Sequence, residues 1–268
     1  MRIAAIQMTS TPDKSHNLAE AHRLLREALE KKPEIVAFPE NSLLFCDKAD
    51  DWRAGAETIS GVMASTLQEW AADYGVHIVG GSIPLKVSGK KKITNTSLVI
   101  DPQGEIVARY DKIHLFDADL GGDKTRYLES DLVQAGKKPV IAKTSLVDFG
   151  LGICYDLRFP ELFRKYSEKD VPAVFLPTAF TALTGKAHWD ALTRARAIEN
   201  QFYLIAPCQW GEHYPGRHTH GHTRIIDPWG RIIAERPAGP GVIWADLSND
   251  ELNRVRREIP CLSNRKLS

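Results

Sequence analysis

The chain has 268 residues, enough for one large α/β domain, and its 35 Lys and Arg residues nearly balance its 34 Asp and Glu residues. A formal net charge of +1 provides no excess for non-specific phosphate binding, so we expect no nucleic-acid partner. The first apolar stretch is too short for a secretory signal, and no run could span a bilayer, so we expect a cytoplasmic protein without membrane contact.

Apolar runs rich in β-branched residues recur along the chain and predict strands that alternate with helices. The predicted strands are 3–8, 35–38, 77–80, 97–100, 106–109, 140–142, 147–153, 174–176, 202–207, 223–227 and 242–246. The predicted helices are 17–31, 63–74, 159–168, 188–201 and 249–257. Segment 222–234, interrupted by Asp-Pro-Trp-Gly, predicts a hairpin. Together these elements predict a layered α/β domain.

The first candidate for chemistry follows the strand at 35–38, where Pro39 and Glu40 end an apolar run. A carboxylate held at the end of such a strand can act as a general base. The alternative is that Glu40 begins a helix and accepts hydrogen bonds from its free backbone amides.

The second candidate is Lys112, which follows the strand at 106–109. A fixed positive charge there could stabilise the oxyanion that forms when a thiolate adds to a carbonyl or nitrile carbon. The alternative is a surface salt bridge between Lys112 and its neighbour Asp111.

The third candidate is Cys154, which lies between the strand at 147–153 and a helix expected to begin near Pro160. Backbone amides and a helix N-terminus at such a junction favour a thiolate, which suits a nucleophile. The four cysteines are widely spaced without a Cys-x-x-Cys pair, so we expect reduced thiols rather than disulfides or a zinc site. The alternative is that Cys154 only packs in the core.

These three motifs, Phe-Pro-Glu, Asp-Lys-Ile-His-Leu-Phe and Gly-Ile-Cys-Tyr-Asp-Leu-Arg-Phe-Pro-Glu-Leu, occur in order, each after an apolar run. The set resembles the Glu–Lys–Cys triad of the nitrilase superfamily, the carbon–nitrogen hydrolases. The resemblance extends over nearly the whole chain, through the segments AAIQM, GGSIP, LPTAF, HWDALTRARAIENQFYLIAP and GHTRIIDPWG. It implies a four-layer αββα sandwich whose monomers pair through their outer helices, so we expect a homodimer or larger homo-oligomer.

We therefore assign residues 1–248 to the carbon–nitrogen hydrolase domain. Residues 249–268 would form a C-terminal helix and a tail, and the short polar tail after Pro260 would be either loose or in contact with a partner subunit. Segment 117–126 has no readable periodicity, and its shape is left unassigned.

The resemblance also implies a mechanism. Glu40 would deprotonate Cys154, the thiolate would attack an amide carbonyl, and Lys112 would hold the oxyanion. Ammonia would leave with a proton from Glu40, and water activated by Glu40 would hydrolyse the thioester. Glu129 matches a second glutamate of many members and would orient Lys112 or the substrate amide, the alternative being a solvated loop acid. No metal or organic cofactor is expected.

The residues after Cys154 resemble the amidase branch, which accepts amides of small dicarboxylic acids, rather than the true nitrilases. The amide of deaminated glutathione is the expected substrate. The alternatives are α-ketoglutaramate, an N-carbamoyl amino acid, and a catalytically silent interaction protein.

Two residues next to the cysteine, Tyr155 and Arg158, are candidates for binding substrate, Arg158 because its planar fork matches a carboxylate. The alternative for Arg158 is an internal ion pair with Asp156 or Glu161. Three residues after the strand at 174–176 are expected to line the same pocket: Thr178, Phe180 and Thr181.

Overall fold

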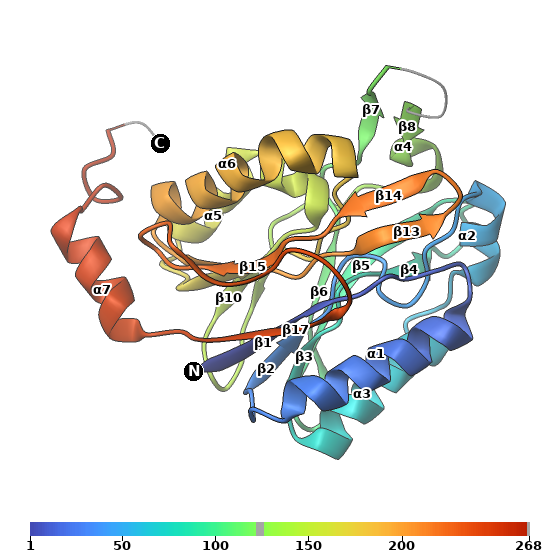
Figure 1. Ribbon diagram of the computed structural model, residues 1–268, viewed down its shortest axis with the longest axis horizontal. Coiled ribbons are helices and arrows are strands. Elements are labelled where there is room, and N and C mark those ends of the chain that lie inside the picture. Colours follow the sequence, from blue (N-terminus) through green and yellow to red (C-terminus); the bar gives the residue numbers. More distant parts are fainter. Residues whose placement is uncertain (122–125, 267–268) are drawn as a thin grey trace.

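The computed structural model describes residues 1–121 and 126–266 and has four layers in the order helix, sheet, sheet, helix (Figure 1). Helices α1 (Lys14–Leu29) and α3 (Val62–Tyr74) pack on the first sheet, and α5 (Pro160–Ser167) and α6 (Ala182–Asn200) pack on the second. This arrangement confirms the four-layer αββα sandwich. Residues 122–125, within the unassigned segment 117–126, and residues 267–268 of the tail lie outside the described residues.

The first sheet has the strand order β17-β1-β2-β3-β5-β4, with β6 paired to β5. Strands β1, β2 and β3 are parallel, and the remaining pairs are antiparallel. The bounds are β1 Arg2–Gln7, β2 Ile35–Ala37, β3 His77–Val79, β4 Ile83–Lys86, β5 Ile93–Ile100, β6 Ile106–Asp111 and β17 Gly241–Asp246.

The second sheet has the order β16-β15-β12-β11-β10-β9, with β10, β11 and β12 parallel. Strands β15 and β16 are antiparallel neighbours, which confirms the hairpin predicted at 222–234. The bounds are β9 Ile141–Ala142, β10 Phe149–Leu151, β11 Ala173–Phe175, β12 Tyr203–Ala206, β15 Thr223–Ile226 and β16 Ile232–Arg236.

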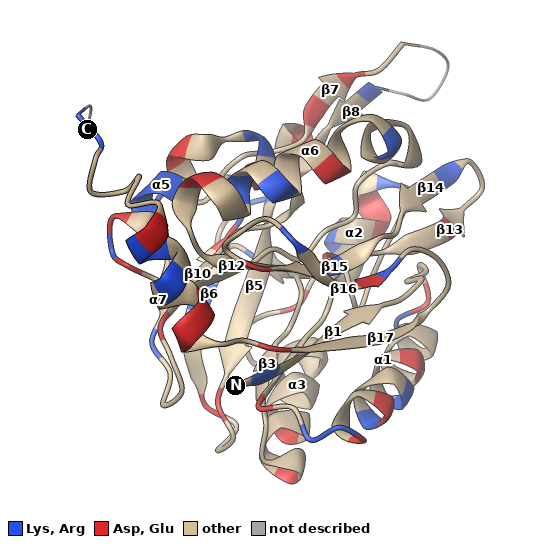
Figure 2. Ribbon diagram, turned by 60° about the vertical axis from the view of Figure 1, so that its left-hand side comes forward, with Lys and Arg blue, Asp and Glu red and all other residues tan. Residues whose placement is uncertain are grey.

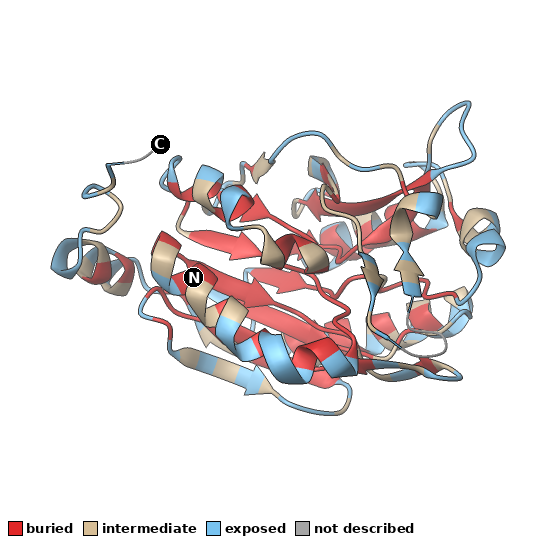
Figure 3. Ribbon diagram, turned by 90° about the horizontal axis from the view of Figure 1, so that it is seen from above, coloured by how far each residue is buried: buried red, intermediate tan, exposed pale blue. Residues whose placement is uncertain are grey.

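The main core lies between the two sheets, whose central strands are buried, whereas β6 and β16 are partly exposed (Figure 3). Aromatic side chains fill much of it, including Tyr110 and the pair Phe149 and Phe175, whose ring centroids are 4.6 Å apart. Charged residues gather on the helices and loops and leave the sheets largely uncharged (Figure 2). A burial pattern of this kind follows from sheets covered by helices on both outer faces.

The remaining elements surround one end of the sandwich or follow it. They are α2 Ala49–Gly55, β7 Asp117–Asp119, β8 Arg126–Leu128, α4 Glu129–Leu132, the 3₁₀ helix η1 Cys154–Arg158, β13 Trp210–Tyr214, β14 Arg217–His220 and α7 Asn249–Glu258. Neither the ribbon β13–β14 nor β4 was predicted, because β4 contains a proline and the ribbon turns at Pro215 and Gly216, which resemble loop residues.

Helix α6 begins at Ala182 rather than at the predicted 188, because Thr181 caps it: the Thr184 N–H donates to the Thr181 hydroxyl at 3.2 Å. The predicted strand at 147–153 ends at Leu151. The two residues beyond it lead directly into η1.

Helix α7 packs on its own chain, with Leu252 and Val255 buried. Gln201 donates to the Ile259 carbonyl at 2.6 Å, and Arg256 donates to the Val171 carbonyl at 3.1 Å. The helix is therefore anchored to its own chain. Among the described residues, no helix is both long enough and apolar enough to cross a membrane.

Candidate active site

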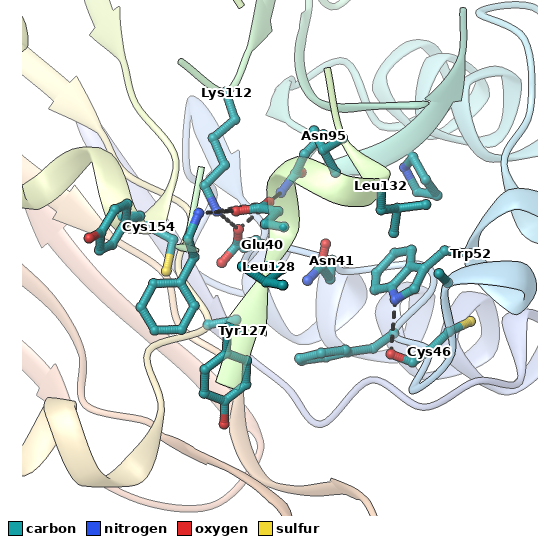
Figure 4. A pocket seen from close by; sticks show the side chains of 18 of the residues that line it. Glu40, Asn41, Cys46, Trp52, Asn95, Lys112, Tyr127, Leu128, Leu132 and Cys154 are labelled. Atoms are coloured by element: carbon teal, nitrogen blue, oxygen red, sulfur yellow. Dashed lines mark hydrogen bonds and ion pairs between the residues drawn. The ribbon is translucent and has the colours of Figure 1, made fainter. Parts of the chain in front are cut away.

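A buried ion cluster lies where the two sheets meet, formed by Glu40 after β2, Lys112 after β6 and Glu129 at the start of α4 (Figure 4). The Lys112 Nζ is 2.8 Å from Glu40 Oε1 and 2.9 Å from Glu129 Oε2. Lys112 is 2% exposed and Glu40 is 3% exposed. Burial alone would lower the pKa of Lys112, but the negative charges of Glu129 and Glu40 outweigh it and hold that pKa well above its usual value. The Lys112 ammonium is therefore stabilised in its protonated form.

The structure also decides the alternatives for these residues. A turn, not a helix, follows Glu40, so its carboxylate does not cap a helix. Asp111 pairs with Arg109 at 3.0 Å, which leaves Lys112 to the two glutamates. Glu129 is no solvated loop acid, because its Oε2 also accepts the Phe116 N–H at 2.6 Å.

Asn95 on β5 was missed by the sequence prediction and joins both carboxylates. Its Nδ2 donates to Glu40 Oε1 at 3.0 Å and to Glu129 Oε1 at 3.3 Å, and its backbone carbonyl accepts the Lys112 backbone N–H at 2.9 Å. The available signal was an asparagine within the apolar run Ile-Thr-Asn-Thr-Ser-Leu-Val-Ile, since a buried amide in a strand requires polar partners.

Cys154 opens η1, separated from the end of β10 by two residues, and faces this cluster (Figure 4). Its φ of +47° is rare for a residue with a side chain, and the conformation is held by the bond from its N–H to the Pro177 carbonyl at 2.9 Å. Strained backbone of this kind is concentrated at functional sites.

The charge state of Cys154 differs from the sequence expectation of a stabilised thiolate. Burial raises the pKa of the thiol well above its usual value and Glu40 adds to that rise, whereas Lys112 and the Ala179 backbone N–H oppose it only in part. The resting group is therefore a thiol, which needs a base at the moment of attack.

Asp156, two residues after Cys154, holds η1 in place and is fully buried. Its Oδ2 accepts from the Ile153 N–H at 2.8 Å and the Tyr110 hydroxyl at 2.7 Å. Its Oδ1 accepts from the His114 N–H at 3.0 Å and lies 2.7 Å from that residue's Nδ1. The carboxylate thus ties the segment bearing the thiol to the loop that follows β6.

A pocket of about 380 Å³ opens over the cluster, a volume within the range that holds small organic molecules. Tyr155, Arg158, Phe180 and Thr181 line it, together with Glu40, Lys112, Glu129 and Cys154. The prediction for Thr178 needs correction, because it does not line the pocket: it is fully buried, and its hydroxyl donates to the Leu176 carbonyl at 2.7 Å.

Arg158 makes neither of the ion pairs considered as the alternative, with Asp156 or with Glu161, among the interactions of the described residues. Its guanidinium carbon lies 5.1 Å from the Phe180 ring centroid and 5.7 Å from that of Tyr155, and its Nη1 is 3.2 Å from His188 Nδ1. An arginine without a carboxylate partner at a pocket wall suits an anionic ligand.

The opposite side of the pocket is aromatic and was not predicted from the sequence. Trp52, whose Nε1 donates to the Cys46 carbonyl at 2.9 Å, lies there with Cys46 (Figure 4). Phe45, Phe116, Tyr127 and Arg217 also line the pocket, and the Phe116 ring lies 5.0 Å from that of Tyr155, on the side of Cys154. Within residues 1–121 and 126–266, no cluster of three His, Cys, Asp or Glu side chains could hold a metal ion.

The chain is similar in sequence to proteins of known family. Residues 2–257 match the carbon–nitrogen hydrolase family. The chain is 44% identical to a deaminated glutathione amidase of Synechocystis over 98% of this chain and 97% of that protein. It is 37% identical to the omega-amidase NIT2 of Xenopus tropicalis, over 99% of this chain and 95% of that protein.

Solved structures agree with the sequence comparison. The NitFhit protein of C. elegans superimposes with a TM-score of 0.92 at 34% identity, over 99% of this chain and 65% of that longer protein. An amidase variant from Nesterenkonia, with acrylamide added to its active-site cysteine, superimposes with a TM-score of 0.79 at 27% identity, over 97% of this chain and 98% of that protein.

Proposed function

The chain belongs to the carbon–nitrogen hydrolase family, and we propose that it cleaves the amide of deaminated glutathione through a thioester on Cys154. The observation that carries the proposal is the buried cluster of Glu40, Lys112 and Glu129 beside a thiol at a pocket wall. The relatives named deaminated glutathione amidase support the choice of substrate.

The first step requires Glu40 to take the thiol proton. Lys112 and Asn95 occupy Glu40 Oε1, which leaves Oε2 for that proton. Because the raised pKa of Cys154 keeps it protonated at rest, proton transfer accompanies attack of sulfur on the amide carbon. The S–C bond forms, the carbonyl π electrons move to oxygen, and the Lys112 ammonium stabilises the resulting oxyanion.

The oxyanion then collapses and the C–N bond breaks. Glu40 returns its proton to the leaving nitrogen, so a neutral amine departs and a thioester remains. Water next donates a proton to Glu40 as its oxygen attacks the thioester. Collapse of this second oxyanion breaks the C–S bond, releases the carboxylic acid, and restores the thiol with the proton from Glu40.

The leaving group depends on the substrate, and here the sequence expectation of ammonia needs refinement. In deaminated glutathione the amide nitrogen belongs to the cysteinylglycine dipeptide, so hydrolysis releases that dipeptide. A primary ω-amide would release ammonia. In both cases the acyl part carries a free carboxylate, for which Arg158 is the proposed partner.

The second candidate function is hydrolysis of α-ketoglutaramate, favoured by the similarity to an omega-amidase. The two candidates share the acyl group and differ only beyond the amide nitrogen. They are separated by comparing kcat/KM for the two substrates, with an N-carbamoyl amino acid and a nitrile as further members of the panel.

The test of the mechanism compares the wild type with Cys154→Ala on deaminated glutathione, measuring cysteinylglycine release. We expect the variant to show no turnover above background. Cys208→Ala is the matched control, since that thiol is buried away from the pocket. Turnover that survives in Cys154→Ala would exclude the thioester, and wild-type enzyme inactive on deaminated glutathione would exclude the substrate.

A further inference from the structure

Arg217 on β14 is a second arginine at the pocket wall, and two of its three guanidinium nitrogens are buried without a hydrogen-bond partner among the described residues. Its Nε and Nη1 are buried without a hydrogen bond among the described residues. Its guanidinium carbon lies 4.8 Å from the Tyr127 ring centroid and 5.8 Å from that of Phe45. Burying charged donors without partners is unfavourable, so an acceptor brought by a ligand would stabilise this arrangement.

Arg217 and Arg158 lie over different members of one row of aromatic rings. The Tyr127 ring is 5.0 Å from Phe116, and the Phe116 ring is 5.0 Å from Tyr155, measured between centroids. Arg217 lies over Tyr127 and Arg158 over Tyr155. Two cations are thus spaced along a wall that passes the nucleophile, which is the residue before Tyr155.

The hairpin that carries Arg217 is fixed to the pocket. Thr219 bridges to Thr181, and the His220 N–H donates to the Phe180 carbonyl at 2.9 Å. His213, on the paired strand β13, lies 2.7 Å from the Thr219 hydroxyl and 2.7 Å from the Ser10 carbonyl. A guanidinium held on such a support is preorganised for bidentate binding of a carboxylate.

We propose that Arg217 binds the carboxylate of the leaving group and thereby selects amides whose nitrogen carries a carboxylate-bearing peptide. The inference rests on the proposed function. Deaminated glutathione has one carboxylate on each side of the scissile amide, and the two arginines match them. α-Ketoglutaramate has nothing beyond its amide nitrogen for Arg217 to bind.

The experiment measures kcat/KM of wild type and Arg217→Gln for deaminated glutathione and for α-ketoglutaramate. We expect kcat/KM for deaminated glutathione, divided by kcat/KM for α-ketoglutaramate, to fall at least about ten-fold in Arg217→Gln. Most of the fall should come from a higher KM for deaminated glutathione. Arg217→Lys should recover part of the ratio, because lysine keeps the charge but not the fork. Arg23→Gln, which changes an exposed arginine of α1, is the matched control and should keep the wild-type ratio.

A substrate analogue ending in glycinamide completes the test. In the wild type, kcat/KM should be lower for the glycinamide analogue than for the acid, by about the factor that Arg217→Gln costs with the acid. In Arg217→Gln, kcat/KM should differ little between the analogue and the acid. The inference would be overturned if folded Arg217→Gln kept the wild-type ratio of the two kcat/KM values. It would also be overturned if Arg217→Gln lowered kcat/KM by the same factor for the acid and the glycinamide analogue. In both cases the proposed function would stand. Wild type that fails to cleave deaminated glutathione would overturn both.

Discussion

Glu129 illustrates how one carboxylate can tune another group without touching the reacting atoms. It contacts the Lys112 ammonium through both oxygens, at 2.9 and 3.1 Å, and helps to raise the pKa of that lysine. Its proposed role is therefore positional and electrostatic, and removing its charge should change the pH dependence of turnover.

Glu129→Gln removes a negative charge that raises the pKa of Lys112, so that pKa should fall. Since the protonated lysine is proposed to hold the oxyanion, the alkaline limb of the kcat/KM profile should move to lower pH. We also expect kcat to fall about 100-fold, the scale found when an oxyanion donor is lost. The profile is measured by steady-state kinetics, with the exposed Glu69→Gln as control. An alkaline limb that stays in place or rises would contradict this role.

Asp156 shows how a residue that is not proposed to react can still fix the proposed nucleophile, Cys154. Each of its two oxygens accepts one backbone N–H, that of Ile153 on one side and that of His114 on the other. An asparagine in either orientation would turn its NH₂ group toward one of these N–H groups. One buried donor would then lose its partner.

Asp156→Asn should therefore lower the free energy of unfolding by about 3 kcal/mol, measured by urea titration. Asp101→Asn is the matched control, because both N–H donors of that turn, from Gln103 and Glu105, meet a single oxygen that an asparagine can supply. We expect the control to change stability by less than about 0.5 kcal/mol. Equal effects of the two substitutions would remove Asp156 from its anchoring role.

At the scale of elements, the loop that carries Lys112 depends on the close approach of Gly136. The Gly136 N–H donates to the Lys112 carbonyl at 2.8 Å, and a Cβ at this glycine would clash with the Asp111 carbonyl oxygen. Two segments far apart in sequence therefore touch backbone to backbone, and only glycine allows that contact.

Gly136→Ala should push this loop away and carry Lys112 with it. We expect kcat/KM to fall at least about ten-fold, because a displacement near 1 Å at a reacting group can cost about 100-fold. Gly89→Ala is the control: its φ of +68° makes alanine unfavourable, but no atom lies within 4 Å of the added Cβ. Steady-state kinetics and Tm of both variants test the argument, and wild-type kinetics in Gly136→Ala would refute it.

The elements also show what the sequence could reveal about the site. Glu40, Lys112 and Cys154 each follow an apolar strand, so local pattern located them. Asn95 and Arg217 were not found, because one lies inside a strand and the other on a ribbon whose proline and glycine resemble a loop. The residues that they contact are distant in sequence, and the local spacing of residues does not predict such long-range contacts.

At the scale of the whole molecule, the site exists only where the two sheets pack together. Glu40 and Lys112 come from the first sheet and Cys154 from the second. Gln209, which follows β12 of the second sheet, donates to the Glu40 carbonyl at 2.9 Å and accepts the Ser10 N–H at 3.0 Å. The sequence predicted the layers but not this junction, because the relative position of two packed sheets depends on long-range packing.

An outer face of the sandwich exposes apolar side chains that bear on assembly. Ile198 of α6 is 49% exposed and packs against Gly230, next to Trp229, which is 40% exposed. Arg231 and Arg254 lie over the Trp229 ring, at 6.0 and 5.4 Å from its centroid. We propose that this patch of Ile198 and Trp229 belongs to the contact between two copies of the chain, as expected for pairing through the outer helices.

Ile198→Glu should place a charge in that contact and shift the protein from dimer to monomer, because burying an unpaired carboxylate is unfavourable. Sedimentation velocity at micromolar concentration measures the change, with wild type expected as a dimer or larger. Val107→Glu is the matched control: it adds the same charge at a residue 37% exposed on β6 of the other sheet, and it should keep the wild-type mass. A monomeric wild type would contradict the pairing itself, whereas an Ile198→Glu variant that remains assembled would move the contact to another face of the sandwich.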